Sequence, residues 1–311
     1  MIPAGDHGGD GARLARALGC APEDILDLSA SLNPVAPDPA PVVAAHLDAL
    51  GRYPDPVDAA AALAAAIGVP DDELLLTNGG AEAIALLAAE LGPGWVDEPE
   101  FSLYRRHLPG LDRRGPRWRS NPRNPTGRLA PATATAGVWD EAFWPLATGS
   151  WTRGDHQRGA VVLGSLTKLL ACPGLRVGYV LAAPGLIERL RRRQPQWAVN
   201  GLACAALPDL LAGVDLVAWA TETARLRQEL VALLARHGLN TAPSDANWVL
   251  VTAPALRTAL AGHGILVRDC ASFGLPGTVR IAVPAAAGRS RLAAALESSS
   301  LSEVEAPPCP A

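Results

Sequence analysis

The most informative stretch of the chain reads Val161-Val-Leu-Gly-Ser-Leu-Thr-Lys168. Its first residues are apolar or small, which predicts a buried strand, and the turn after them carries two hydroxyl groups and ends in a lysine. Ligands of open α/β sheets bind at the carboxyl ends of the strands, where this lysine would lie. The nearby Arg176 and partial burial would both disfavour the ammonium form, as an amine that forms a Schiff base requires. The alternative is a lysine that merely caps a loop.

Lys168 is also the only lysine of the chain, and every other one of the 27 basic residues is an arginine. Arginine supplies charge, ion pairs and phosphate contacts, but it stays protonated and cannot act as an amine nucleophile. Lys168 is therefore a candidate for covalent chemistry. On composition alone, a lysine that survives by chance at the surface is an equal alternative.

Length and composition exclude several classes of protein. A chain of 311 residues is long enough for about two domains. Its net charge of -4 and its thinly spread basic residues argue against a nucleic-acid-binding surface. Apolar runs end before the roughly 18 residues of a membrane span, and the amino terminus lacks a signal-peptide pattern, so we expect a cytoplasmic protein. The 5 cysteines and 6 histidines are scattered and predict no metal site.

Short apolar runs alternate with longer helical segments, which is typical of an α/β fold with a mainly parallel sheet. A buried strand is predicted over 73–77, and Asn78-Gly79-Gly80 turns the chain into a helix over 81–91. Such a turn presents backbone N–H groups and the positive end of the helix dipole to an anion, although an ordinary connection would also use glycine. Further strands are predicted over 94–98, 138–140, 160–164, 176–182, 247–251, 265–268 and 278–283, and helices over 56–67, 215–237, 256–261 and 290–296.

These elements predict two domains and a tail. We expect a large domain over 40–214 and a smaller α+β domain made of 1–39 and 215–297. The remaining residues, 298–311, are rich in proline and are expected to be disordered.

An acidic residue ends another predicted strand. Val138-Trp-Asp140-Glu141 places a carboxylate at the carboxyl end of the strand over 138–140. Beside a pyridine cofactor, such a carboxylate keeps the ring nitrogen protonated and the ring an electron sink. The turn-rich Asn121-Pro-Arg-Asn124 lies upstream, and alone it would be an ordinary loop.

In this order and spacing, the motifs resemble those of the fold-type-I pyridoxal-phosphate enzymes, the class I and II aminotransferase superfamily. The resemblance implies an aminotransferase-like α/β fold, pyridoxal 5'-phosphate as cofactor and a homodimer. It is carried by Tyr53-Pro54, Gly79-Gly-Ala-Glu82, Pro99-Glu-Phe-Ser-Leu-Tyr104, Asn124-Pro-Thr-Gly127, Asp140-Glu-Ala-Phe143, Ser165-Leu-Thr-Lys168 and Gly174-Leu-Arg176.

Within the superfamily, the opening His7-Gly-Gly-Asp10 and the segment Ile25–Pro34 are similar to threonine-phosphate decarboxylases of cobalamin biosynthesis. Phe143 agrees, since the related histidinol-phosphate aminotransferases usually have tyrosine there. The resemblance implies decarboxylation of L-threonine O-3-phosphate to aminopropanol phosphate. Two alternatives stay open: a histidinol-phosphate-type aminotransferase, and a cofactor-binding subunit that acts with a partner protein in cobinamide formation.

The same resemblance assigns roles to individual residues. Lys168 would form the Schiff base, Asp140 would contact the pyridine nitrogen, Asn124 the ring hydroxyl, and Tyr104 would stack on the ring. The cofactor phosphate would be held by Gly80, Ala81, Ser165, Thr167, Arg176 and, from a second subunit, Tyr53. The substrate carboxylate would bind Arg280, and the other substrate-side candidates are His7, Asn33 and Arg268.

One segment departs from the superfamily pattern. Between Gly127 and Asp140 the superfamily usually carries a helix and a strand, but 128–139 is too short to hold both with their turns. We expect the helix to be lost or reduced to one turn.

Overall fold

The computed structural model describes residues 7–299. These residues form two compact units. The smaller unit contains 7–31, 225–244 and 248–299, and the larger unit contains 32–224 and 245–247. The domain limits predicted from the sequence stay a prediction. Of the predicted disordered tail, Ser298 is helical and 300–311 lies outside the described residues.

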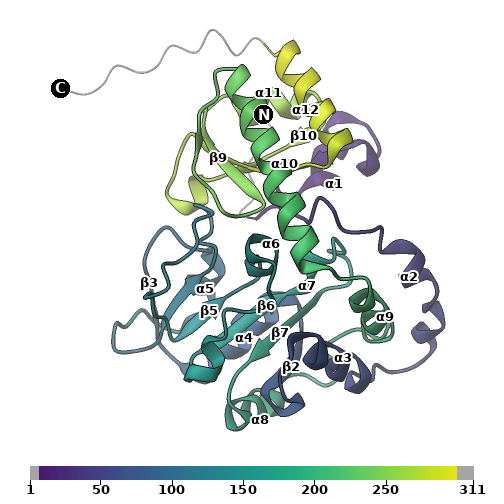
Figure 1. The fold of residues 1–311 in the computed structure, drawn as a ribbon, viewed down its shortest axis with the longest axis vertical. Coiled ribbons are helices and arrows are strands. Elements are labelled where there is room, and N and C mark those ends of the chain that lie inside the picture. The colour runs from purple at the N-terminus through teal and green to yellow at the C-terminus, as the bar shows by residue number, and fades with distance from the viewer. Residues whose placement is uncertain (1–6, 300–311) are drawn as a thin grey trace. The chain divides into compact units, whose positions relative to one another are not determined.

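The larger unit is built on a six-stranded sheet (Figure 1). Neighbouring strands pair in parallel from β3 through β4 and β5 to β6, whereas β7 is antiparallel to both β6 and β2. The predicted α/β fold with a mainly parallel sheet is confirmed. In order across the sheet, the strands are β2 (Leu74–Asn78), β7 (Val177–Leu181), β6 (Val161–Ser165), β5 (Val138–Asp140), β4 (Arg117–Ser120) and β3 (Trp95–Val96).

Helices cover both faces of this sheet. One face packs against α4, α5 and α8, and the other against α3, α7 and α9. Trp118 and Trp139 come from neighbouring strands and are both fully buried, but they belong to the cores of opposite faces. The helices of this unit are α2 (Ala40–Ala44), α3 (Val57–Ile67), α4 (Gly79–Leu91), α5 (Ser102–His107), α6 (Trp144–Thr148), α7 (Leu166–Leu169), α8 (Pro184–Arg193) and α9 (Gly201–Ala212).

The parallel strands bring polar residues to one edge of the sheet. Ser120, Asp140 and Ser165 end β4, β5 and β6 respectively. Ser120 and Asp140 are direct neighbours in the register, and Asp140 also pairs with Leu163. Because parallel strands end on the same side, the sheet itself gathers these side chains where ligands bind in this class of fold.

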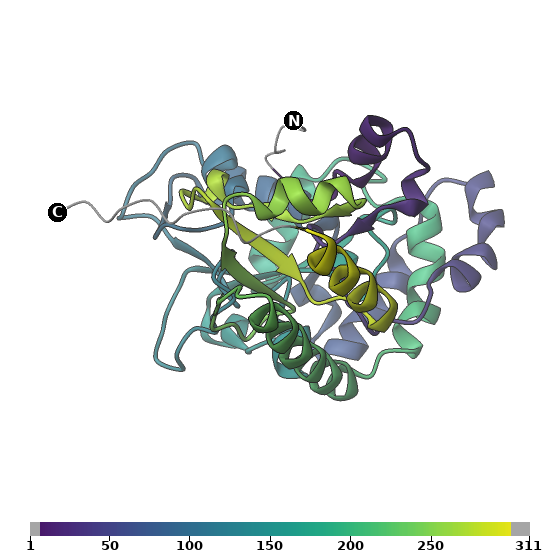
Figure 2. The same cartoon turned by 90° about the horizontal axis from the view of Figure 1, so that it is seen from above.

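The smaller unit contains an antiparallel sheet of four strands in the order β11-β12-β9-β8 and a parallel pair, β1 with β10. The predicted strand over 265–268 is divided at Val267 into β10 and β11, which belong to different sheets. Figure 2 shows α10, α11 and α12 around these strands. The elements are α1 (Gly11–Leu18), β1 (Leu26–Asp27), β8 (Thr241–Ala242), β9 (Trp248–Thr252), α11 (Leu256–Gly262), β10 (Ile265–Leu266), β11 (Arg268–Asp269), β12 (Thr278–Ala282) and α12 (Ala286–Ser298).

The long helix α10 (Leu216–Arg236) confirms the helix predicted over 215–237. Its residues belong to the larger unit as far as Ala224 and to the smaller unit from Arg225. Within residues 7–299, no single helix meets the length and hydropathy needed to cross a membrane, and α9 with α10 does so only as a pair bent by 84°.

The shortened segment 128–137 contains no helix, as predicted. Side-chain donors hold its backbone instead. Arg153 Nη2 donates to the carbonyl oxygens of Ala132 and Ala134, at 2.7 and 3.0 Å, and Asn121 Oδ1 accepts from the Ala130 N–H at 2.9 Å. These hydrogen bonds satisfy backbone groups that a helix would have paired internally.

Candidate active site

Lys168 lies in α7, the short helix that follows β6, and its side chain is half-buried. Asn33 holds the backbone of this helix. The Asn33 N–H donates to the Lys168 carbonyl oxygen at 3.0 Å, and its side-chain amide donates to the Leu169 carbonyl oxygen at 2.9 Å. Thr167 Oγ1 donates to the Val177 carbonyl oxygen at 3.4 Å. In this structure Asn33, predicted on the substrate side, therefore supports the turn that carries Lys168.

Asp140 is buried at the end of β5. The Tyr104 hydroxyl donates to its Oδ2 at 2.7 Å, and the Ala142 N–H donates to its Oδ1 at 3.0 Å. Burial raises the pKa of Asp140 above its usual range, and the hydrogen bonds from Tyr104 and Ala142 oppose that shift. A carboxyl group in such a place is suited to a cationic partner, because an opposite charge favours the ionised form that burial disfavours.

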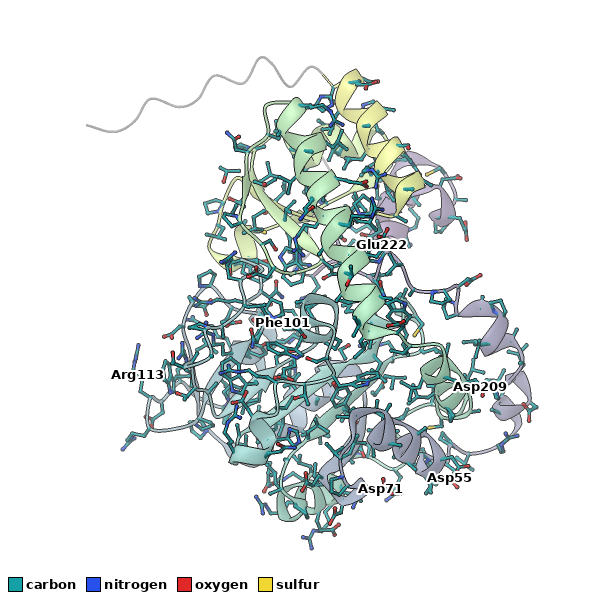
Figure 3. The ribbon with its side chains drawn as sticks, viewed as in Figure 1. Asp55, Asp71, Phe101, Arg113, Asp209 and Glu222 are labelled. Carbon is teal, nitrogen blue, oxygen red and sulfur yellow. The ribbon has the colours of Figure 1, made fainter. Side chains whose placement is uncertain are left out.

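The two aromatic rings of the Pro99–Tyr104 motif differ in burial. Tyr104 is fully buried in α5, and its ring lies 5.8 Å from that of Trp118. Phe101, which precedes α5 and is labelled in Figure 3, is half-buried and meets Tyr104 edge to face at 5.8 Å. The predicted stacking of Tyr104 on a cofactor ring stays a prediction. Phe101 is a second aromatic candidate on the same segment, which was not predicted from the sequence.

The glycine turn before α4 lies against Arg176. Gly79 has φ +72°, and a Cβ atom there would lie 2.6 Å from Arg176 Nη2. A Cβ atom on Gly80 would lie 3.6 Å from the Ser165 Cβ. The first two residues of α4 thus lie against an arginine and a serine, and the exposed Ala81 follows them. Helix-terminal N–H groups, a guanidinium and a hydroxyl are the donors that a phosphate group requires.

Asn124 is buried in the loop after β4, and its backbone N–H donates to Ser120 Oγ at 2.8 Å. Tyr53 lies at the surface of the larger unit. It is 76% exposed, and its ring stacks on that of Trp197 with centroids 4.6 Å apart. A role for Tyr53 in a second subunit stays a prediction.

In the smaller unit, two buried arginines face each other. Arg268 on β11 and Arg280 on β12 are direct partners in the register. Arg280 Nη2 donates to the Ser29 carbonyl oxygen at 3.0 Å, and Arg268 Nη2 donates to Ser272 Oγ at 2.8 Å. Burial lowers the pKa of Arg280 to about 10, and the charge of Arg268 acts in the same direction. Two fixed guanidinium groups so placed are suited to a carboxylate or phosphate.

The His7-Gly-Gly opening packs against Ser29. A Cβ atom on Gly8 would lie 2.2 Å from the Ser29 carbonyl oxygen, and the Gly9 N–H donates to Ser29 Oγ at 2.9 Å. Only glycine allows this approach at residue 8. His7 thereby lines a small pocket of the smaller unit, together with Asp10, Ser29, Arg257, Leu266, Val267, Arg268 and Asp269.

Two further buried acids, Glu100 and Glu141, lie beside the predicted residues. Burial raises the pKa of Glu100 to about 8 and that of Glu141 to about 7. Glu141 accepts from the Arg153 N–H. Both are inside the motifs already quoted, but nothing in a single sequence distinguishes them from exposed acids.

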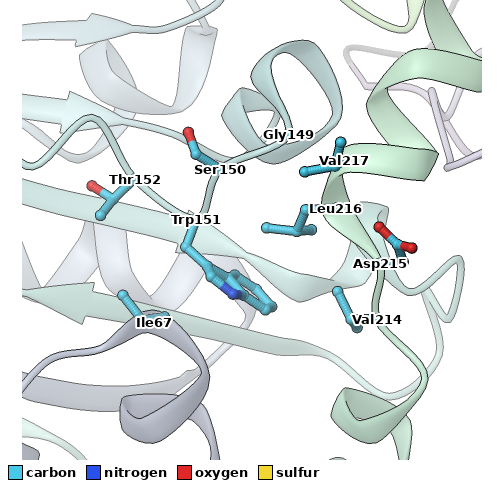
Figure 4. A pocket seen from close by; sticks show the side chains of 9 residues that line it. All are labelled: Ile67, Gly149, Ser150, Trp151, Thr152, Val214, Asp215, Leu216 and Val217. Atoms are coloured by element: carbon cyan, nitrogen blue, oxygen red, sulfur yellow. The ribbon is translucent and has the colours of Figure 1, made fainter.

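A separate pocket of about 580 Å³ in the larger unit contains none of the predicted residues (Figure 4). Its wall combines apolar side chains with those of Ser150, Thr152 and Asp215, and the side chain of Trp151 extends across it. The lining residues are Ile67, Gly149, Ser150, Trp151, Thr152, Val214, Asp215, Leu216 and Val217.

The residues of the larger unit fit pyridoxal phosphate. A half-buried lysine, a buried carboxyl group, and a helix N-terminus beside an arginine match the aldehyde, the ring nitrogen and the phosphate of that molecule. The close approach of Arg176 to Gly79 brings the backbone N–H groups at the start of α4 and a guanidinium together, which is a donor set that a phosphate could use.

Comparison with known proteins gives the same family. The model of the aminotransferase class I and II family matches residues 119–298. The threonine-phosphate decarboxylase of Salmonella typhimurium is 31% identical over 93% of this chain and 95% of its own. Histidinol-phosphate aminotransferase 1 of Dechloromonas aromatica is 29% identical over 91% of this chain and 92% of its own.

The fold also matches a solved structure. Histidinol-phosphate aminotransferase from Sinorhizobium meliloti, in complex with pyridoxal-5'-phosphate, is 20% identical, with a TM-score of 0.79 over 92% of this chain and 93% of its own. With the family match and the donors described above, the chain belongs to the class I and II aminotransferase family and is a pyridoxal-phosphate-dependent enzyme.

Proposed function

We propose that the protein is a threonine-phosphate decarboxylase, which converts L-threonine O-3-phosphate to aminopropanol phosphate in cobalamin biosynthesis. The observation that supports this most is in the smaller unit. Arg280 and Arg268 are buried opposite each other, and Arg268 also lines the pocket of His7. An amino acid with a carboxylate and a phosphate carries two anions, which this set of cationic side chains suits.

The larger unit would hold the cofactor, which supplies an electron sink to the bond that breaks. Lys168 would carry the cofactor, and Asp140 would hold a proton on its ring nitrogen. Asn124 would donate to the ring hydroxyl. The phosphate would be bound by Gly80, Ala81, Ser165, Thr167 and Arg176.

Substrate orientation would decide the reaction. The side chains that bind the amino acid would decide whether its carboxylate or its Cα hydrogen is lost, so a decarboxylase would have to hold the carboxylate in the position from which it leaves. Arg280 would hold that carboxylate, while His7 and Arg268 would hold the phosphate. Lys168 Nζ would then deliver a proton to the carbon that has lost the carboxylate.

A histidinol-phosphate-type aminotransferase is the second candidate, and its support is the nearly equal identity to the Dechloromonas aromatica protein. It would need the same cofactor contacts but a different orientation of the substrate. A third candidate is a cofactor-binding subunit that requires a partner protein in cobinamide formation. The helix-free segment 128–137 favours it, because that segment departs from the superfamily pattern.

We also propose that the protein is a homodimer. Large apolar side chains are exposed on the larger unit, and their burial against a second copy would remove apolar surface from water. Tyr53 belongs to this set and would reach the cofactor phosphate of the second subunit. These exposed apolar residues of the larger unit are Leu47, Leu50, Tyr53, Val57, Leu111, Trp197 and Val217.

The function is tested with purified protein and pyridoxal phosphate. The visible absorbance of the bound cofactor is recorded, then threonine phosphate is added while carbon dioxide and aminopropanol phosphate are assayed. Lys168→Arg is the control and is expected to lose the visible band and the release of carbon dioxide. A keto product formed with an amino acceptor would instead identify an aminotransferase, and a bound cofactor without turnover would favour the partner-dependent subunit.

A further inference from the structure

A buried acid that has no role in the proposed reaction lies behind the loop that carries Asn124. The Glu100 side chain is 2% exposed. It contacts Ser120, which ends β4 and is the direct neighbour of Asp140 in the sheet. Burial of a carboxyl group costs free energy unless hydrogen bonds replace those lost to water. The hydrogen-bond partners of Glu100 therefore indicate its role.

Hydrogen bonds connect Glu100 to Asn124 through a single hydroxyl group. Ser120 Oγ donates to Glu100 Oε2 at 2.5 Å, and the Ser120 N–H donates to Glu100 Oε1 at 3.2 Å. The same Ser120 Oγ accepts from the Asn124 N–H at 2.8 Å. A hydroxyl has one hydrogen, so its donation to Glu100 directs a lone pair to Asn124 and strengthens that acceptor.

Arg123 ties the same loop to the segment before α5. Its Nε lies 3.6 Å from Glu100 Oε1 and donates to the Pro99 carbonyl oxygen at 3.1 Å. Its Nη2 donates to the Asp97 carbonyl oxygen. Both ends of the Ser120–Asn124 turn are therefore attached to the 97–100 segment.

We propose that Glu100 is a positioning residue, which acts through Ser120 to fix Asn124 where it donates to the cofactor ring hydroxyl. The inference rests on the proposed role of Asn124. It assigns to Glu100 no contact with cofactor or substrate. Removal of Glu100 would leave the cofactor-binding groups in place but loosen the direction of one of them.

The test uses apoprotein titrated with pyridoxal phosphate. Its readouts are the apparent cofactor Kd and the visible absorbance maximum of the bound cofactor, and Asn124→Ala sets the reference shift. Glu100→Ala and Ser120→Ala are each expected to raise the Kd about tenfold, the effect of one lost buried hydrogen bond, and to shift the maximum in the direction of Asn124→Ala. Glu100→Gln, which keeps one acceptor, is expected to have a smaller effect of about threefold.

A double variant tests the route through Ser120. Because both residues act on one hydrogen bond, Glu100→Ala with Ser120→Ala is expected to be no worse than either single change. Glu90→Gln is the matched control. Its carboxylate also pairs with arginines of the larger unit, Arg189 and Arg193, but lies at the far end of α4, so neither readout should change.

The outcomes separate this inference from the proposals on which it rests. If Glu100→Ala does not fold, Glu100→Gln and Ser120→Ala decide, and an unshifted maximum in both overturns the inference. Additive losses in the double variant overturn it as well. An unshifted maximum in Asn124→Ala removes the role of Asn124 itself. Failure to decarboxylate threonine phosphate leaves these readouts untouched, since none of them uses a substrate.

Discussion

The two compact units bury opposite charges. The buried carboxyl groups of the larger unit include those of Glu100, Asp140 and Glu141, and burial raises the pKa of each of these three. The smaller unit buries the guanidinium groups of Arg268 and Arg280, and burial lowers the pKa of Arg280. A carboxyl group can become neutral near pH 7, whereas a guanidinium whose pKa is about 10 cannot. Near pH 7, protonation can therefore change the charge of the buried carboxyl groups of the larger unit but not that of the buried Arg280.

The difference matches the two kinds of ligand that the family and the proposed function require. A pyridine nitrogen needs a carboxylate beside it, and a phosphorylated amino acid needs fixed cations. We infer that the larger unit is specialised for the cofactor and the smaller unit for the substrate anions. Variants in the larger unit should then change the affinity and the absorbance of the cofactor. Variants in the smaller unit should change kcat/KM for the substrate.

The largest effect is expected for Lys168→Ala. Loss of the only lysine removes the amine that attaches the cofactor, so turnover should fall by about a thousandfold or more. The visible absorbance of the bound cofactor should disappear, while thermal unfolding of the apoprotein changes little because the side chain is half-buried. A retained visible band would contradict the assignment.

The buried acids should make the apoprotein less stable as the pH rises. Unfolded glutamate loses its proton near pH 4.5, but folded Glu141 keeps it to about pH 7 and folded Glu100 to about pH 8. Across this interval the unfolded state binds fewer protons, so the free energy of unfolding falls as the pH increases. For Glu141 the total is on the order of 3 kcal/mol.

Urea unfolding of the apoprotein at pH 5, 6 and 7 measures this dependence. In Glu141→Gln the free energy of unfolding is expected to fall less steeply with pH, because the contribution of Glu141 is removed. Glu90→Gln should keep the wild-type slope, because hydrogen bonds from Arg193 and Arg189 lower the pKa of Glu90. If the free energy of unfolding fell equally steeply with pH in the wild type and in Glu141→Gln, the raised pKa of Glu141 would be contradicted.

In the smaller unit, Arg280→Met should weaken the substrate and spare the cofactor. Loss of one charge-assisted contact is expected to lower kcat/KM for threonine phosphate by about a hundredfold, with the cofactor absorbance unchanged. Stability should not fall with activity, since burial of a guanidinium itself costs free energy. Arg291→Met, at an exposed arginine of the same unit, is the control. A changed cofactor absorbance in Arg280→Met would contradict the hypothesis that the smaller unit binds the substrate and not the cofactor.

The parts of the site that depend on strand ends could be predicted from the sequence. Asp140 ends one apolar strand and Lys168 follows another, so the pattern of apolar residues locates both at the edge of the sheet. Strand β4 was not predicted, because Arg117 and Arg119 flank Trp118 and make the segment look polar. In the structure the Arg119 guanidinium lies 5.7 Å from the ring centroid of the buried Trp139.

Contacts between distant segments could not be predicted in this way. The Tyr104 hydroxyl on Asp140 joins residues 36 apart, and the Asn33 amide on Leu169 joins residues 136 apart. A single sequence carries no signal for such pairs, since each partner has an ordinary local pattern. The motif resemblance named Tyr104 and Asn33, but only the packing shows what each side chain holds.

Of the effects that compare the two units, the smallest is expected for Gly79→Ala, which tests the phosphate contacts of the larger unit. Alanine at φ +72° is strained, and its Cβ would lie 2.6 Å from Arg176 Nη2, so the guanidinium must move. We expect the apparent Kd for pyridoxal phosphate to rise about tenfold, equivalent to one charge-assisted hydrogen bond. Gly68→Ala is the matched control, because φ is +82° there and no atom lies within 4 Å of its Cβ. It should lose stability without losing cofactor affinity, and equal affinities in the two variants would mean that Arg176 does not bind the phosphate.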